Sequence, residues 1–295
     1  MHKIKVPASS ANLGPGFDTL GIALNIYDTF TFEEIPEGLE IIGCDQHYNN
    51  EDNLIYLSMI KALAEMDYKI SGVRITVDSD IPISNGLGSS AACIVGGVFG
   101  ANELAGRPFS KNDLLKIATD IEGHPDNVAP AIFGGLVVSI MDRVDVIHNN
   151  IDVANGLKFV ALIPNFKLST KKARAVLPKK ISYKDGVYNV SRVSLLISAL
   201  SNGKFELLKY GLGDRLHQPY RGNLIPDYED IMAICQQHNA LGTFLSGAGP
   251  TIMALTEEDN KDFVHDIKDD LKSLINTWEV KELSIDFEGA TRIEG

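Results

Sequence analysis

The pattern of apolar and polar positions predicts a chain of mixed strands and helices. Apolar and polar residues alternate along 1–35, 39–44 and 73–78, as in half-buried strands. Leu57, Ile60 and Ala64 instead recur at helical spacing and predict a helix over 53–67. The same criteria predict further strands at 136–141, 144–148, 158–164, 243–247, 251–256 and 280–288, and further helices at 93–104, 110–122, 127–134, 170–177, 188–201, 204–212, 227–239 and 258–275. Because the two kinds of element do not alternate regularly, we expect an α+β fold rather than a doubly wound sheet.

Length and composition narrow the class of protein. The chain has 295 residues and turns polar near 149–156, which predicts two domains, 1–155 and 156–295. Its formal net charge of −12 argues against DNA or RNA as a partner. No apolar run of ~20 residues and no signal-peptide core appears, so we expect a cytoplasmic protein with no membrane partner. The 3 cysteines are far apart and lack C-x-x-C spacing, which argues against a disulfide framework or a zinc site.

The most informative stretch is 82–92, which lies between a predicted strand and a predicted helix and reads PISNGLGSSAA. A strand, a glycine loop and a helix start turn backbone N–H groups toward an anion, so the stretch predicts a site for a nucleotide triphosphate. No lysine follows the glycines, which excludes a Walker A loop, and Ala91 replaces the third glycine of a dinucleotide fingerprint. The structural alternative is a tight turn in which Ser89 or Ser90 only caps the helix. Two adjacent hydroxyls favour the phosphate site, because one can bond phosphate while the other faces a metal ion.

A second candidate group combines a polar turn with two distant arginines. Asn12 and Asp18 flank the turn 14–16, where the alternative is that each side chain closes only an Asx-turn. Arg174 and Arg221 lie in polar segments of the second half. Guanidinium groups bind carboxylates through paired hydrogen bonds, so both are candidates to hold a substrate carboxylate, and the alternative is an ordinary solvated arginine.

Residues 122–130 place Glu122 at the end of a predicted helix and His124, Asp126 and Asn127 in the loop that follows. The alternative for Asp126 or Asn127 is a cap on the next helix. Glu122 is harder to explain structurally, because the helix dipole disfavours an anion at the C-terminus. A bound Mg²⁺ would offset that cost.

Two further features leave more than one interpretation open. His124 and His217 are either catalytic or held by structural hydrogen bonds, and for His217 the structural role is favoured because the sequence shows no partner. The turn 246–250 is either a tight hairpin or a second backbone cradle near a transferred phosphate.

Taken together, these segments resemble the GHMP small-molecule kinases over nearly the whole chain. The motif P-x-x-x-G-L-G-S-S-A-A is matched over 82–92 and is highly specific to that superfamily. The stretches 10–18 and 123–130, with the D-x-x-H-x-x-x-R spacing of 214–221, resemble the branch that phosphorylates homoserine. No motif position departs from the family pattern.

The resemblance implies a ribosomal-protein-S5-domain-2-like N-terminal domain and a ferredoxin-like C-terminal domain. It also implies ATP and Mg²⁺ as cofactors, L-homoserine as acceptor, a place in threonine biosynthesis and a homodimer. By position, ATP would be bound by Asn53, Pro82, Ile83, Ser84, Asn85, Gly86, Leu87, Gly88, Ser89, Ser90, Ala91 and Ala92. Ser90 and Glu122 would hold Mg²⁺ and act in catalysis with Asp18, which either accepts the hydroxyl proton or orients the hydroxyl. The acceptor would be bound by Asn12, Asp18, His124, Asp126, Thr170, Arg174, Arg221 and Gly247.

Two other functions fit parts of the sequence. A sister GHMP kinase acting on mevalonate, a phosphorylated isoprenoid precursor or a sugar would share the glycine loop. Two arginines with Asn12 and Asp18 suit a zwitterionic amino acid better than an uncharged sugar. A non-catalytic relative that keeps the fold as a ligand sensor is disfavoured, because the complete loop is accompanied by Ser90 and Glu122.

Overall fold

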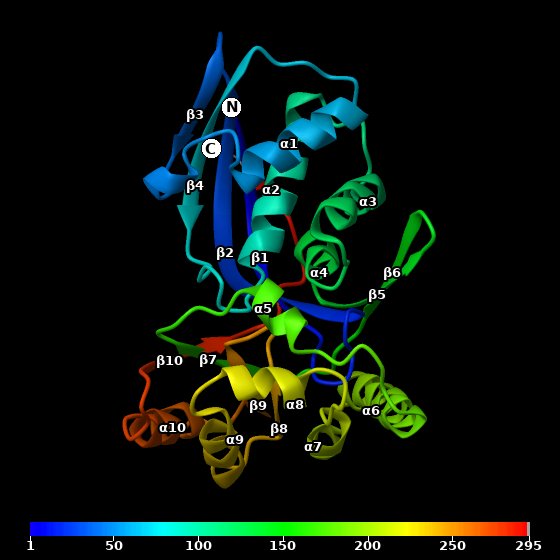
Figure 1. The fold of residues 1–295 in the computed structure, drawn as a ribbon, viewed down its shortest axis with the longest axis vertical. Helices are drawn as coiled ribbons and strands as arrows, with labels where there is room; N and C mark the ends of the chain where they lie inside the picture. Colours follow the sequence, from blue (N-terminus) through cyan, green and yellow to red (C-terminus); the bar gives the residue numbers. More distant parts are fainter. Residues whose placement is uncertain (294–295) are drawn as a thin grey trace.

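The computed structural model describes residues 1–293 and contains two β-sheets in separate halves of the molecule (Figure 1). The first sheet has the order β11-β1-β2-β4-β3, and a hairpin of β5 and β6 pairs with β2 through β5. Its strands are β1 (His2–Ala11), β2 (Leu20–Glu34), β3 (Gly38–Ile42), β4 (Gly72–Ser79), β5 (Leu136–Asp142), β6 (Asp145–Ile151) and β11 (Thr291–Ile293). The long strand β2 is the centre of this sheet, because it pairs with β1, β4 and β5.

Helices cover one face of the first sheet, and the central one is α2. These helices are α1 (Leu54–Glu65), α2 (Ser89–Leu104), α3 (Lys111–Glu122) and α4 (Val128–Phe133), with a short 3-10 turn η1 (Gln46–Tyr48) before them. Small residues let α2 approach its neighbours closely. A Cβ on Gly96 would lie 2.3 Å from the ring of Phe30, and one on Gly97 would lie 2.3 Å from the carbonyl oxygen of Ile55 in α1.

The second sheet has the order β10-β7-β9-β8, and all of its pairs are antiparallel. Its strands are β7 (Leu157–Pro164), β8 (Gly242–Leu245), β9 (Ile252–Glu257) and β10 (Trp278–Leu283). Its helical segments are α5 (Thr170–Ala175), α6 (Tyr183–Asn202), η2 (Phe205–Leu207), α7 (Leu208–Gly211), α8 (Gln218–Arg221), η3 (Gly222–Leu224), α9 (Tyr228–Gln237) and α10 (Phe263–Leu271). This is the β-α-β-β-α-β succession of a ferredoxin-like domain, as the resemblance implied. Within residues 1–293, no helix is both long and apolar enough to cross a membrane.

Strand β7 is buried on both faces, which explains its unbroken apolar run. Phe159 and Ala161 belong to the core that continues into the first sheet. Val160 and Leu162 belong to a second core with α9 and α10, in which Ile231 takes part. Because successive side chains of a strand point to opposite faces, every residue of this run faces one core or the other.

The predicted α+β class is confirmed, and most predicted elements are found within a few residues of their expected bounds. Three elements have bounds that differ clearly from the prediction. Helix α6 begins at Tyr183 rather than 188, because Ser182 caps it by accepting from the Asp185 N–H. Helix α10 covers only Phe263–Leu271 of the predicted 258–275. The last predicted strand, 280–288, ends as β10 at Leu283, because the chain then crosses to the first sheet.

That crossing bears on the domain division, which stays a prediction. The boundary at 155/156 falls between β6 of the first sheet and β7 of the second. The chain after β10 returns to the first sheet, where the Asn25 N–H donates to the Ser284 carbonyl and β11 pairs with β1. The sequence analysis did not predict β11, because three residues are too few to show an alternating pattern.

The close packing of α2 on α1 predicts opposite effects for two helical glycine substitutions. Gly97→Ala should lower the free energy of unfolding by about 1–3 kcal/mol, because the added methyl overlaps the Ile55 carbonyl. Gly186→Ala in α6 is the matched control: its methyl meets only the tip of Ile181, and alanine favours a helix by up to about 1 kcal/mol. Urea denaturation followed by circular dichroism measures both, and equal effects would show that the α1–α2 contact is not tight.

Candidate active site

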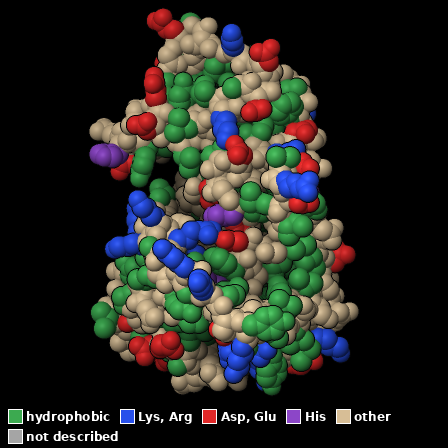
Figure 2. Space-filling model, turned by 45° about the vertical axis from the view of Figure 1, so that its right-hand side comes forward, with side chains coloured by type: hydrophobic (Ala, Val, Ile, Leu, Met, Phe, Trp, Pro, Cys, Tyr) green, Lys and Arg blue, Asp and Glu red, His purple; other side chains and the backbone are tan. Residues whose placement is uncertain are grey.

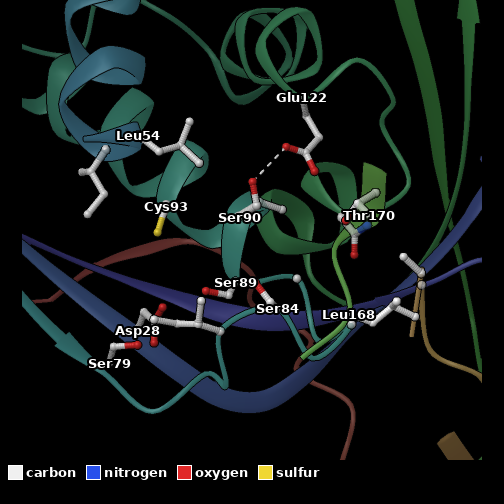
Figure 3. A pocket seen from close by; sticks show the side chains of 18 of the residues that line it. Asp28, Leu54, Ser79, Ser84, Ser89, Ser90, Cys93, Glu122, Leu168 and Thr170 are labelled. Atoms are coloured by element: carbon white, nitrogen blue, oxygen red, sulfur yellow. Dashed lines mark hydrogen bonds between the residues drawn. The ribbon is translucent and has the colours of Figure 1, made fainter. Parts of the chain in front are cut away.

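A cavity of about 360 Å³ lies where the two halves of the chain meet. The first half contributes the glycine loop, the start of α1 and the end of α3, and the second half contributes α5, Arg221 and the turn after β8. Figure 3 shows Ser90 and Glu122 pointing toward each other on one side, with Asp28 and Ser79 at another end. This volume falls in the ordinary range for small-molecule sites.

The glycine loop presents an uncapped helix start to this cavity. Gly88 is the N-cap of α2, with φ +74°, and no side chain bonds the first-turn N–H groups. The alternative in which Ser89 or Ser90 caps the helix is therefore wrong. Uncapped N–H groups and the positive end of the helix dipole together attract an anion.

The rest of the loop divides into lining and bracing residues. The lining residues are Ile83, Ser84, Gly86, Gly88, Ser89, Ser90 and Ala91. Pro82, Asn85, Leu87 and Ala92 do not line the cavity. Asn85 donates to the Pro164 carbonyl at 3.2 Å, and Leu87 is fully buried, so these two hold the loop in place.

Ser90 and Glu122 form an oxygen-rich pair beside the helix start. The Ser90 hydroxyl donates to the Glu122 carboxylate, with Oγ and Oε2 3.3 Å apart. Burial raises the pKa of Glu122, although His124 and Ser90 partly oppose the shift. Glu122 is the last residue of α3, where the helix dipole also disfavours its charge. A hydroxyl and a carboxylate are hard oxygen ligands of the kind that Mg²⁺ takes, so this pair fits a magnesium ion.

Asp18 and Arg174 join the two halves through a bidentate ion pair. The Arg174 guanidinium donates to both carboxylate oxygens of Asp18, at 2.8 and 3.0 Å. The Asp18 N–H donates to the Asn12 side-chain oxygen at 3.0 Å, and the Asn12 amide donates to the Gly247 carbonyl at 2.9 Å. Neither side chain closes an Asx-turn, so that alternative is wrong. Burial alone would lower the pKa of Arg174, but its bonds and attraction to Asp18 outweigh burial and raise it.

Arg221 and His217 are buried behind this ion pair. Arg221 is 2% exposed and donates to the carbonyls of Ala173 and Gly247. Burial, together with repulsion from Arg174, lowers the pKa of Arg221 to about 10. His217 is fully buried, and its Nε2 lies 2.7 Å from the carbonyl oxygen of Gly14. Because a carbonyl oxygen can only accept a hydrogen bond, Nε2 must carry the proton. His217 has a structural partner, as the sequence analysis favoured.

His124 and Asp126 form a further pair at the cavity wall. Nδ1 of His124 lies 2.6 Å from a carboxylate oxygen of Asp126. Burial lowers the pKa of His124, but Asp126 and Glu122 outweigh burial and raise it.

Asn127 is the N-cap of α4 but its side chain makes no capping bond. Its side-chain oxygen instead accepts from the Ser9 hydroxyl at 3.0 Å. Asp18, His124 and Asp126 could also hold a metal ion, because their ligand atoms lie within 4.8 Å of one another. In this structure, however, Asp18 is bonded to Arg174, and His124 is in contact with Asp126.

The remaining predicted residues also reach the cavity. Asn53 lines it while capping α1, by accepting from the N–H groups of Ile55 and Tyr56. Thr170, the exposed first residue of α5, faces it from the second half. Gly247 lines it too, but its N–H donates to the Ala11 carbonyl and its own carbonyl accepts from Asn12 and Arg221.

The sequence analysis missed several residues at this site. The ring of Phe17 lies under both Arg174 and Arg221, and its place in the predicted turn is the one sequence indication of its role. Asp28, Cys44 and Tyr48 also line the cavity, but they come from scattered segments without a motif. Burial raises the pKa of Asp28, even though hydrogen bonds from Ser79 and neighbouring N–H groups act against it.

Comparisons with known proteins identify the family of this chain. The GHMP kinases N terminal domain matches residues 53–135, and the GHMP kinases C terminal domain matches 196–271. A homoserine kinase of Clostridium botulinum (strain ATCC 19397 / Type A) is 56% identical over 97% of this chain and 96% of its own length. A homoserine kinase of Clostridium beijerinckii is 52% identical over 100% of this chain and 99% of its own. The crystal structure of homoserine kinase from Cytophaga hutchinsonii superposes with a TM-score of 0.90 at 29% identity, covering 99% of this chain and 97% of that one. The chain belongs to the GHMP kinase family.

Proposed function

We propose that this chain transfers the γ-phosphoryl group of ATP to the hydroxyl of L-homoserine, giving O-phospho-L-homoserine and ADP, as a step of threonine biosynthesis. One observation carries the proposal: the uncapped start of α2 and the Asp18–Arg174 ion pair line the same cavity. The start of α2 suits the phosphates of ATP, and the ion pair suits an acceptor that carries one positive and one negative charge.

The ion pair offers a zwitterion two opposite charges at hydrogen-bonding distance. L-homoserine carries an ammonium and a carboxylate on one carbon. Its ammonium can replace Arg174 beside Asp18, while its carboxylate replaces Asp18 beside Arg174. Both charges of the protein then keep a partner, so binding leaves no charge unpaired. Mevalonate has a carboxylate but no ammonium, and would leave Asp18 without a counter-charge.

Phosphoryl transfer at this site depends on positioning and on neutralising phosphate charge. The N–H groups at the start of α2 face the phosphates, and Ser90 with Glu122 would hold Mg²⁺. When bound, Mg²⁺ supplies charge neutralisation on the phosphate oxygens. The homoserine hydroxyl oxygen forms the new bond to the γ-phosphorus as the bond to the β-γ bridging oxygen breaks. Asp18 accepts the hydroxyl proton.

The predicted homodimer and the predicted cytoplasmic location stay predictions.

Acceptor selectivity tests the proposed function. In a coupled ADP-release assay, L-homoserine should be phosphorylated, whereas 4-hydroxybutyrate, which lacks only the ammonium, should lose about tenfold or more in kcat/KM, equivalent to about 1.4 kcal/mol. Mevalonate is the second comparison and should be a poor acceptor for the same reason. Turnover of mevalonate with none of L-homoserine would reject the proposal, and ATP binding without turnover of any acceptor would point to a sensor.

Proton acceptance by Asp18 is tested by Asp18→Asn, which keeps the shape of the side chain. We expect kcat to fall by roughly 10²–10⁴-fold, the usual contribution of a general base. Steady-state kinetics with saturating ATP separates the two parameters. A near-normal kcat with only a raised KM for L-homoserine would assign Asp18 to binding alone.

The metal site is tested by Ser90→Ala and Glu122→Gln. Each should raise the half-saturating Mg²⁺ concentration by about tenfold or more, because each removes a hard oxygen ligand or its support. Binding of Mn²⁺ to the enzyme–ADP complex, followed by electron spin resonance, gives a readout that does not depend on turnover. Glu229→Gln on α9, away from the cavity, is the control and should change neither value. Unchanged metal affinity in both test variants would place the ion elsewhere.

A further inference from the structure

The sequence concentrates positive charge in one short segment of an acidic chain. Residues 167–184, here called the basic segment, contain no Asp or Glu. Their cationic side chains are Lys167, Lys171, Lys172, Arg174, Lys179, Lys180 and Lys184. The whole chain carries a formal net charge of −12, so the basic segment opposes the field of the rest of the molecule.

The part of the basic segment around α5 borders the cavity proposed to hold the nucleotide. It contains α5, and its residues Leu168, Thr170 and Arg174 line the cavity. Lys171 lines an adjoining hollow together with Glu122 and His124. Figure 2 shows Lys and Arg side chains gathered beside the hollow in the surface, at the height where Figure 1 places α5.

The lysines of the basic segment lack acidic partners, unlike many lysines elsewhere. All six are exposed, and among residues 1–293 none of them lies within ion-pairing distance of a carboxylate. By contrast, three lysines elsewhere form ion pairs: Lys61 with Asp120, Lys116 with Asp145, and Lys158 with Glu282. Unpaired like charges repel one another, so this arrangement costs stability and leaves an uncompensated positive field at the cavity mouth.

The cavity needs such a field because its own walls are acidic. Five carboxylates line it against two arginines, Arg174 and Arg221; the carboxylates belong to Asp18, Asp28, Asp45, Glu122 and Asp126. A nucleotide triphosphate that approaches through solvent meets these carboxylates and the negative charge of the whole chain. Exposed lysines hold a bound ligand only weakly at short range, but their field extends over a Debye length of about 10 Å at 0.1 M salt.

We propose that the basic segment is an electrostatic capture surface for the polyphosphate of the nucleotide, and that it acts on the association rate rather than on the chemical step. The inference rests on the proposed function, because it takes the cavity to be the ATP site. Charge of one sign at a cleft raises association rates by roughly 10- to 10³-fold and loses its effect as salt is added.

The test is stopped-flow binding of N-methylanthraniloyl-ATP to the full-length protein. The variant Lys171→Glu with Lys172→Glu reverses two exposed charges in the first turn of α5, where the helix dipole favours acidic residues, so we expect the variant to fold. Its association rate constant should fall about tenfold or more at low ionic strength. The difference from wild type should shrink as salt rises from about 0.02 M to about 0.5 M, while kcat at saturating ATP stays within about twofold.

The matched control is Lys261→Glu with Lys268→Glu, at and just before α10, which makes the same change in net charge away from the cavity. Its association rate should stay within about twofold of wild type.

Two outcomes would overturn the proposal. Equal slowing in both double variants would show an effect of net charge alone, and no slowing in the Lys171→Glu, Lys172→Glu variant would show that its charges do not act on association. If the wild type phosphorylates L-homoserine but the Lys171→Glu, Lys172→Glu variant binds the labelled ATP at the wild-type rate, the capture surface is overturned and the proposed function stands. A wild type that binds no nucleotide would overturn the proposed function as well.

Discussion

The rest of the structure depends on one constraint: the glycine loop is held by both sheets at once. Its Leu87 carbonyl accepts from the Ser9 N–H of β1, and its Gly86 carbonyl accepts from the Ser246 hydroxyl after β8. A Cβ on Gly86 would lie 2.5 Å from the Ser246 carbonyl, and one on Gly88 would lie 2.1 Å from the Ser9 hydroxyl. Only glycine fits both positions, so the loop that we propose as the phosphate site also joins the two halves.

This double attachment explains how charge is distributed around the cavity. The loop has no lysine, so in the proposed function the backbone N–H groups of α2 would attract the phosphates. The cations come instead from the second half, as Arg174 in the ion pair, the buried Arg221 and the exposed lysines of the basic segment. The acidic groups Asp18 and Glu122 come from the first half. Opposite charges therefore meet at the place where the loop joins the two halves.

Local chemistry made much of the fold predictable from the sequence. The helix predicted over 110–122 is found as α3, because Ser110 and Asp113 form a capping box at its start and Gly123, in a left-handed conformation, ends it. Prediction was wrong where a local rule competed with tertiary structure. Ser89 and Ser90 look like caps, but the N-cap is Gly88. The apolar residues after Leu283 look like a continued strand, but they cross to the first sheet, which offers them partners.

The sequence by itself determined which residue types the proposed site would use, because the glycine loop, Glu122 and the turn after Asn12 are local motifs. It could not determine which distant groups would touch. Asp18 and Arg174 are 156 residues apart and meet only when both sheets share the core beside β7. Likewise, the run Phe159–Ile163 is apolar throughout, and only packing decides which alternate residues face which core. Short-range steric and hydrogen-bonding preferences are written in neighbouring residues, whereas long-range pairing is settled by burial of the whole chain.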